Sequence, residues 1–130
     1  MKHIAKITTV LLLMTFLLAS PAGAITSVTT HTNLSASKTK IHKGDLVKFK
    51  VVLKAGKNKC RSHMPIKLYK GNKVVAKKKT SNKGKVTFKQ HPKKTAKWWA
   101  KFAGKKVGKH PKRLNCLPSQ SKKKKVVVKH

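Results

Sequence analysis

Two cysteines and seven histidines are the residues of this chain that most readily do chemistry. His63 follows Cys60 by three positions and His110 precedes Cys116 by six, and these are side chains of the types that bind a transition metal. Metal-binding clusters usually show tighter paired spacings than these. Cys60 and Cys116 are also the only pair that can form a disulfide, and this is the interpretation that we favour.

Catalysis has few side chains to use in this sequence. Asp45 is the only acidic residue, which excludes hydrolases with paired carboxylates and carboxylate cages for calcium or magnesium. It stands in a turn sequence, where Asp is favoured for backbone reasons. His91 and His110 each precede a proline and basic residues, which indicates two surface turns, with a shared metal or pH-sensing site as the alternative. We therefore expect no enzymatic activity and no cofactor.

The charge of the chain is its strongest signal. Lys and Arg together number 34 against a single Asp or Glu, for a formal net charge of +33. This surplus predicts an anionic partner. Arginine, which suits bidentate recognition of phosphates and bases, occurs only twice, so sequence-specific reading of nucleic acid is not expected. The candidate polyanion-binding residues lie in one alternating segment and two dense runs: Lys48, Lys50, Lys77, Lys78, Lys79, Lys122, Lys123, Lys124 and Lys125.

Residues 1–24 have the pattern of a secretory signal peptide. A basic start is followed by an apolar stretch over 7–19 and by Ala22-Gly23-Ala24, the small residues that precede cleavage. The apolar stretch is too short to span a bilayer; a buried N-terminal helix is the alternative. We expect cleavage after Ala24, export, and no transmembrane span in the mature protein, whose charge would be +31. Export also favours the disulfide, because the extracellular compartment is oxidising.

The remaining residues read as short strands separated by turns. Apolar and polar residues alternate with a period of two, and no segment shows the apolar stripe of a helix. We predict one domain over 25–130, an antiparallel β-sandwich of about seven strands, with a small closed barrel as the alternative. Residues 104–120 are predicted to form a long loop that holds Cys116. The predicted strands cover 28–36, 46–53, 66–69, 73–77, 85–89, 97–103 and 125–129, and the predicted core contains Phe49, Leu68, Phe88, Trp98 and Phe102.

Four segments carry a resemblance to a known family. They are the turn Lys43-Gly44-Asp45 before Val47-Lys48-Phe49, the hairpin Gly71-Asn72-Lys73-Val74-Val75-Ala76, the stretch from Thr80 through Gly84 to Phe88, and the run Trp98-Trp99-Ala100-Lys101-Phe102-Ala103-Gly104. Over residues 28–129 the chain resembles the bacterial immunoglobulin-like domains of secreted and cell-surface proteins. The resemblance implies that Cys60 and Cys116 lie in two loops at the same end of the sandwich. It also implies that Trp98 is central to the core and that Trp99 faces outward or lies beneath a loop.

The expected function is that of a secreted structural or interaction module. Its lysines would hold it to anionic extracellular material without specificity: wall polymers, polysaccharide or DNA. One alternative is a secreted cationic effector, antimicrobial or envelope-binding, although such proteins usually carry a basic amphipathic helix. The other is an inhibitor or protein-binding module that uses the loops tied by the cysteines.

Overall fold

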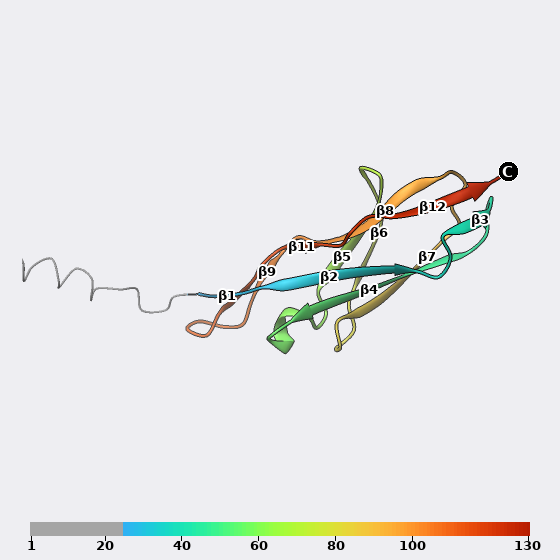
Figure 1. The fold of residues 1–130 in the computed structure, drawn as a ribbon. Helices are drawn as coiled ribbons and strands as arrows, with labels where there is room; N and C mark the ends of the chain where they lie inside the picture. The colour runs from blue at the N-terminus through green and yellow to red at the C-terminus, as the bar shows by residue number, and fades with distance from the viewer. Residues whose placement is uncertain (1–24) are drawn as a thin grey trace, which may run out of the picture.

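The computed structural model describes residues 25–130, and nearly all of its regular structure is strand (Figure 1). The predicted signal peptide lies outside the described residues. One short 3-10 helix, η1 (Asn58–Cys60), follows the fourth strand. The strands are β1 (Thr26–Val28), β2 (Thr30–Ala36), β3 (Lys40–His42), β4 (Val47–Ala55), β5 (Pro65–Lys70), β6 (Lys73–Lys79), β7 (Lys85–Gln90), β8 (Ala96–Phe102), β9 (Lys105–Val107), β10 (Leu114–Cys116), β11 (Ser119–Gln120) and β12 (Lys124–Lys129).

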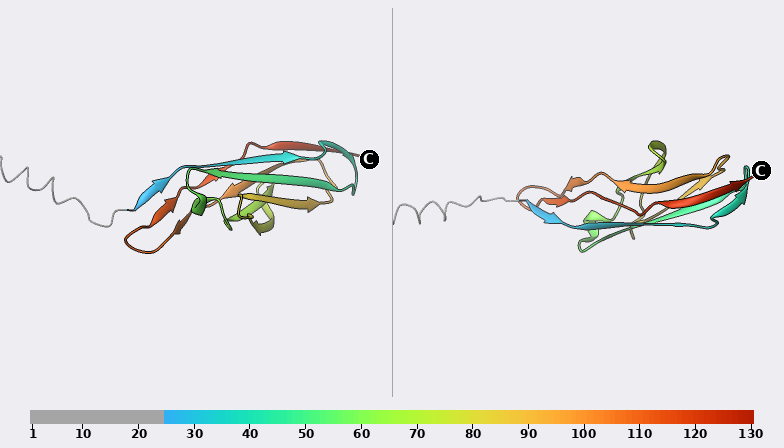
Figure 2. Two further views of the ribbon diagram at one scale, coloured as in Figure 1. Left: turned by 90° about the horizontal axis from the view of Figure 1, so that it is seen from below. Right: turned by 45° about the horizontal axis from the view of Figure 1, so that its top comes forward.

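The strands form three sheets. One is antiparallel, in the order β2-β4-β7, and a six-stranded sheet has the order β3-β12-β8-β5-β6 with β11 paired to β8. A small third sheet, β1-β10-β9, lies at the end of the molecule opposite the C-terminus (Figure 2). The prediction of all-β structure is confirmed. The prediction of purely antiparallel pairing is wrong at two places, because β1 pairs parallel to β10 and β3 pairs parallel to β12.

The core lies between the two larger sheets. In β4 the buried Val47, Phe49, Val51 and Leu53 alternate with Lys48, Lys50, Val52 and Lys54, because successive side chains of a strand point to opposite faces. Phe49 stacks on Trp98 of β8 with ring centroids 4.7 Å apart, so the inner faces of these sheets meet. Every residue assigned to the core from the sequence is at most 2% exposed: Phe49, Leu68, Phe88, Trp98 and Phe102.

The prediction of a long loop over residues 104–120 is wrong. This segment contains β9, β10 and β11, and β10 pairs with both β1 and β9. These strands have only two or three residues, too few to show a period-two pattern. β3 was missed for the same reason, although its Ile41 is only 3% exposed.

The predicted disulfide joins Cys60 to Cys116, whose Cα atoms are 5.4 Å apart. Cys60 ends η1, between β4 and β5, whereas Cys116 ends β10 instead of lying in a loop. Both residues are fully buried. The bond therefore ties the small sheet to the segment that connects the two larger sheets.

Candidate polyanion-binding surface

The outer face of the β2-β4-β7 sheet carries a set of lysines. Lys48 and Lys50, both predicted from the alternation in β4, are exposed. Lys48 lies directly opposite Lys89 of β7, and Lys54 and Lys85 are exposed on the same two strands. Lys48 and Lys89 are therefore a like-charged cross-strand pair, and the other lysines of this face lie opposite uncharged residues or His31.

The six-stranded sheet presents lysines on its outer face in two rows. Lys67 of β5 lies opposite Lys77 of β6 on one side and Lys101 of β8 on the other, which gives three lysines in one row. Lys97 of β8 lies opposite Lys125 of β12 in the second row. Lysines from the β5–β6 hairpin and from two strands later in the sequence, β8 and β12, are thus gathered on one face by the register of the sheet.

The run Lys77 to Lys79 does not act as one cluster. Lys77 joins the first row, whereas Lys78 lies opposite the buried Ile66 at the sheet edge. The ammonium of Lys78 donates a hydrogen bond of 3.1 Å to the Thr87 carbonyl of β7, so it reaches toward the other large sheet. Lys79 ends β6 and is exposed.

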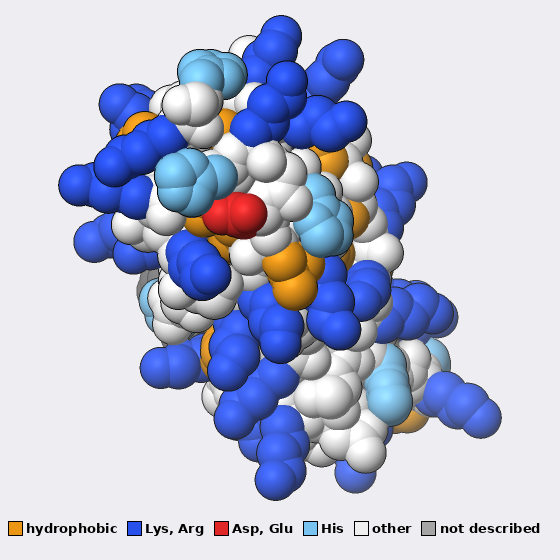
Figure 3. Space-filling model, turned by 90° about the vertical axis from the view of Figure 1, so that its right-hand side faces the viewer, with side chains coloured by type: hydrophobic (Ala, Val, Ile, Leu, Met, Phe, Trp, Pro, Cys, Tyr) orange, Lys and Arg blue, Asp and Glu red, His pale blue; other side chains and the backbone are white. Residues whose placement is uncertain are grey.

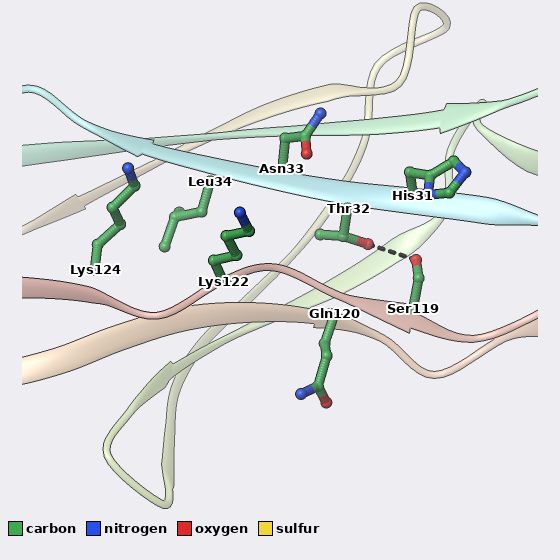
Figure 4. A pocket seen from close by; sticks show the side chains of 8 residues that line it. All are labelled: His31, Thr32, Asn33, Leu34, Ser119, Gln120, Lys122 and Lys124. Atoms are coloured by element: carbon green, nitrogen blue, oxygen red, sulfur yellow. Dashed lines mark hydrogen bonds between the residues drawn. The ribbon is translucent and has the colours of Figure 1, made fainter.

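The run Lys122 to Lys125 is divided in the same way. Lys122 and Lys124 line a groove along β2, and their ammonium groups point toward that strand (Figure 4). Lys123 instead places its Nζ 5.9 Å from the centre of the Trp99 ring, and Lys125 joins the second row. Consecutive lysines therefore serve two surfaces; for Lys124 and Lys125 this follows from the period of β12, whose successive side chains point to opposite faces.

The groove along β2 has a polar floor. The hydroxyl groups of Thr30 and Thr32 each lie 2.7 Å from the hydroxyl of Ser119 in β11, and Thr30 donates to the Leu117 carbonyl at 2.7 Å. These bonds hold β2 against the β11–β12 segment. The groove is lined by His31, Thr32, Asn33, Leu34, Ser119, Gln120, Lys122 and Lys124.

The one acidic side chain does not neutralise these lysines. Asp45 accepts a hydrogen bond of 3.0 Å from the backbone N–H of His42, which closes the turn before β4. Figure 3, which looks onto the end with the C-terminus, shows Lys and Arg side chains on every side of this single red residue. The charge is spread around the molecule and is not confined to one patch.

Sequence reasoning missed one surface feature, a stacked pair of aromatic rings. Tyr69 of β5 and Trp99 of β8 lie opposite each other on the outer face of the six-stranded sheet, with ring centroids 4.1 Å apart. The outward position of Trp99 follows from the alternation of its strand, as expected. The pairing with Tyr69 depends on the register between β5 and β8, which no local pattern reveals.

The cysteines and histidines of residues 25–130 are not arranged as a metal site. Cys60 and Cys116 bind each other and are not available as thiolate ligands. Within that range, no group of three or more His, Cys, Asp or Glu side chains is placed to hold a metal ion. No helix of the described part of the chain is long and apolar enough to cross a membrane.

No protein-family model matches the chain, and no curated protein matches it.

Proposed function

We propose that this chain is a secreted immunoglobulin-like β-sandwich module that associates electrostatically with anionic extracellular or cell-wall polymers. The observation that carries the proposal is that lysines face lysines across both large sheets, as in the pair Lys48 and Lys89 and in the row Lys77, Lys67 and Lys101. The chain has one carboxylate side chain, and that group is engaged in a turn.

Folding stability gives no reason for this arrangement. Like charges directly opposite on neighbouring strands destabilise a sheet, and a large net charge destabilises the compact state by self-repulsion. A surface of mixed charges keeps a protein soluble without this cost. An anionic polymer, in contrast, neutralises the lysines of both sheets. Binding then relieves the repulsion between them.

The immunoglobulin-like assignment is supported by the arrangement of the strands. Seven strands of six or more residues make up most of the two large sheets, whose inner faces meet at Phe49 and Trp98. Cys60 lies between β4 and β5 and Cys116, at the end of β10, lies between β8 and β12, so the disulfide brings together two connections of the large sheets, in keeping with the resemblance, which puts both cysteines at one end of the sandwich. In such domains the loops at one end of the sandwich lie together.

Binding of this kind depends on the number of contacts and not on a particular sequence. Lysine is a compact point charge, whereas arginine offers a planar fork that matches phosphates. A surface whose charged groups are almost all lysines therefore holds any flexible polyanion. The affinity falls as salt ions compete for the same charges.

Fractionation of the producing cells tests the proposal. We expect the protein in the wall fraction at low salt and its release by about 1 M salt, at which the Debye length is roughly 3 Å. A variant with K48Q, K50Q, K77Q and K125Q should be lost from the wall at lower salt than the wild type. The matched variant with arginine at the same four positions should stay bound. Protein that remains in the wall at 1 M salt, or four-fold neutral and four-fold arginine variants that behave alike, would contradict the proposal.

A further inference from the structure

The outer face of the six-stranded sheet holds an aromatic pair that the core does not need. Tyr69 and Trp99 are half-buried and stack with an angle of 13° between their planes. The indole Nε1 of Trp99 donates a hydrogen bond of 2.8 Å to the Gly71 carbonyl, in the turn between β5 and β6, which fixes the orientation of the ring. Val74 of β6 lies opposite Tyr69 and is 42% exposed, so the aromatic pair has an apolar neighbour on that strand.

The two rows of lysines lie on either side of this pair. Along β8, Trp99 stands midway between Lys101 and Lys97, which are about 13 Å apart at about 3.3 Å per residue. Lys101 belongs to the row with Lys67 and Lys77, and Lys97 to the row with Lys125. Lys123 adds an ammonium group over the Trp99 ring. The aromatic rings and the lysines around them form one surface, which we call the aromatic–lysine face: Tyr69, Trp99, Lys67, Lys77, Lys97, Lys101, Lys123 and Lys125.

A ligand that uses the whole face needs an anionic backbone and flat rings that are free to stack. Polymers of polyol phosphate or of uronic acids have the charge but no aromatic rings. Duplex DNA has aromatic bases, but they are already stacked within the helix. A membrane surface is disfavoured because both rings are half-buried and stacked on each other, which leaves little apolar area to insert into a bilayer. Single-stranded nucleic acid has both features, since its bases are accessible and its phosphates follow the chain.

We propose that the aromatic–lysine face binds single-stranded nucleic acid, with bases stacked on the ring faces that Tyr69 and Trp99 do not cover in each other, Lys123 turning from the Trp99 ring to a phosphate, and the other phosphates held by the lysine rows. This inference rests on the proposed polyanion binding and makes it more specific. The contacts involve the ring faces of the bases and the charges of the backbone, so the preference is for single strands over other polyanions and not for a base sequence.

The test compares two labelled 12-mers of equal charge by fluorescence anisotropy at one salt concentration. One is oligothymidine and the other is an abasic strand with the same phosphates. We expect oligothymidine to bind about tenfold more tightly, which corresponds to the stacking of about one base. W99L, which keeps apolar cover on the sheet, should abolish the difference, and Y69F, which keeps the ring, should preserve it. The pair K48Q and K50Q, on the other large sheet, should leave the preference for oligothymidine in place, because neither residue belongs to the aromatic–lysine face.

Each other outcome has a defined meaning. Equal affinity for the two 12-mers overturns this inference but leaves the proposed polyanion binding in place. A heparin fragment of equal charge that competes as well as oligothymidine, and loses affinity equally in W99L, makes the face a glycan site and overturns it. Leakage of anionic vesicles that depends on Trp99 makes it a membrane site and also overturns it. Failure to bind any of these polyanions overturns both proposals. Circular dichroism of each variant separates loss of binding from loss of fold.

Discussion

At the scale of single residues, a few buried side chains hold together segments that have little regular structure. The connection between β4 and β5 contains η1, Cys60 and the sequence up to Met64, and it packs against the core without a partner strand. The bond from Cys60 to Cys116 and the hydroxyl of Thr80, which follows β6, help to fix it there, together with side-chain hydrogen bonds of Arg61 and Ser62. The disulfide and the Thr80 hydroxyl can each be removed by substitution.

Removal of the disulfide should lower the stability of the fold. The bond closes a loop with a sequence separation of 56, and loss of a native disulfide from a small domain typically costs about 2–5 kcal/mol. We expect the C60A/C116A variant to unfold at lower urea concentration than the wild type. Wild type treated with a thiol reductant should match the variant. Unfolding of the variant at the wild-type urea concentration would contradict the stabilising role of the bond.

Loss of the Thr80 hydroxyl should lower the free energy of unfolding. It accepts a hydrogen bond of 2.8 Å from the Met64 N–H and donates one of 2.6 Å to the Arg61 carbonyl, and Thr80 itself is only 3% exposed. T80V keeps the shape but leaves buried polar groups unpaired, at a cost of about 1–3 kcal/mol. Urea unfolding should show this loss for T80V and almost none for T29V, which alters an exposed threonine. Similar losses in the two variants would argue against the bonds as the cause.

At the scale of elements, the alternation of side chains and the register of the strands determine which charges meet. Alternation is local, so the inward set of β4 and the outward lysines of that strand could be predicted from the sequence. Register is not local, because the row Lys77, Lys67 and Lys101 depends on three strands that meet only in the folded sheet. The same limit explains why the pairing of Tyr69 with Trp99 was missed. Short strands such as β3 and β9 to β11 escape detection because two or three residues show no period.

The repulsion between lysines on neighbouring strands can be measured. Lys48 and Lys89 are directly opposite and exposed, so K89E creates an attractive pair that should stabilise the sheet by about 0.2–1 kcal/mol. We expect higher stability in urea at low salt, with the gain reduced at 1 M salt by screening. K109E, in the loop between β9 and β10, changes the net charge equally without forming a cross-strand pair. An equal gain in K109E would assign the effect to net charge and not to the pair.

At the scale of the whole molecule, the net charge of the sequence predicts an anionic partner. The fold determines on which surfaces the lysines lie. The lysines cover the outer faces of both large sheets and the groove along β2, so they belong to a folded surface and not to a disordered tail. The sequence alone could not divide the runs Lys77 to Lys79 and Lys122 to Lys125 between different surfaces. That division follows from the pairing of β6 with β5 and of β12 with β8.

The salt dependence of binding tests the central claim most directly. The affinity of the purified protein for a heparin fragment should be measured at a series of salt concentrations between about 50 and 500 mM. Each charge of the polyanion that a lysine neutralises releases about one counterion. The logarithm of the binding constant should therefore fall linearly and steeply with the logarithm of the salt concentration. Neutral substitutions at Lys48, Lys50, Lys77 and Lys125 should make the slope shallower. A binding constant that barely changes over this range would contradict the account, as would a slope that is unaffected by the loss of these four lysines.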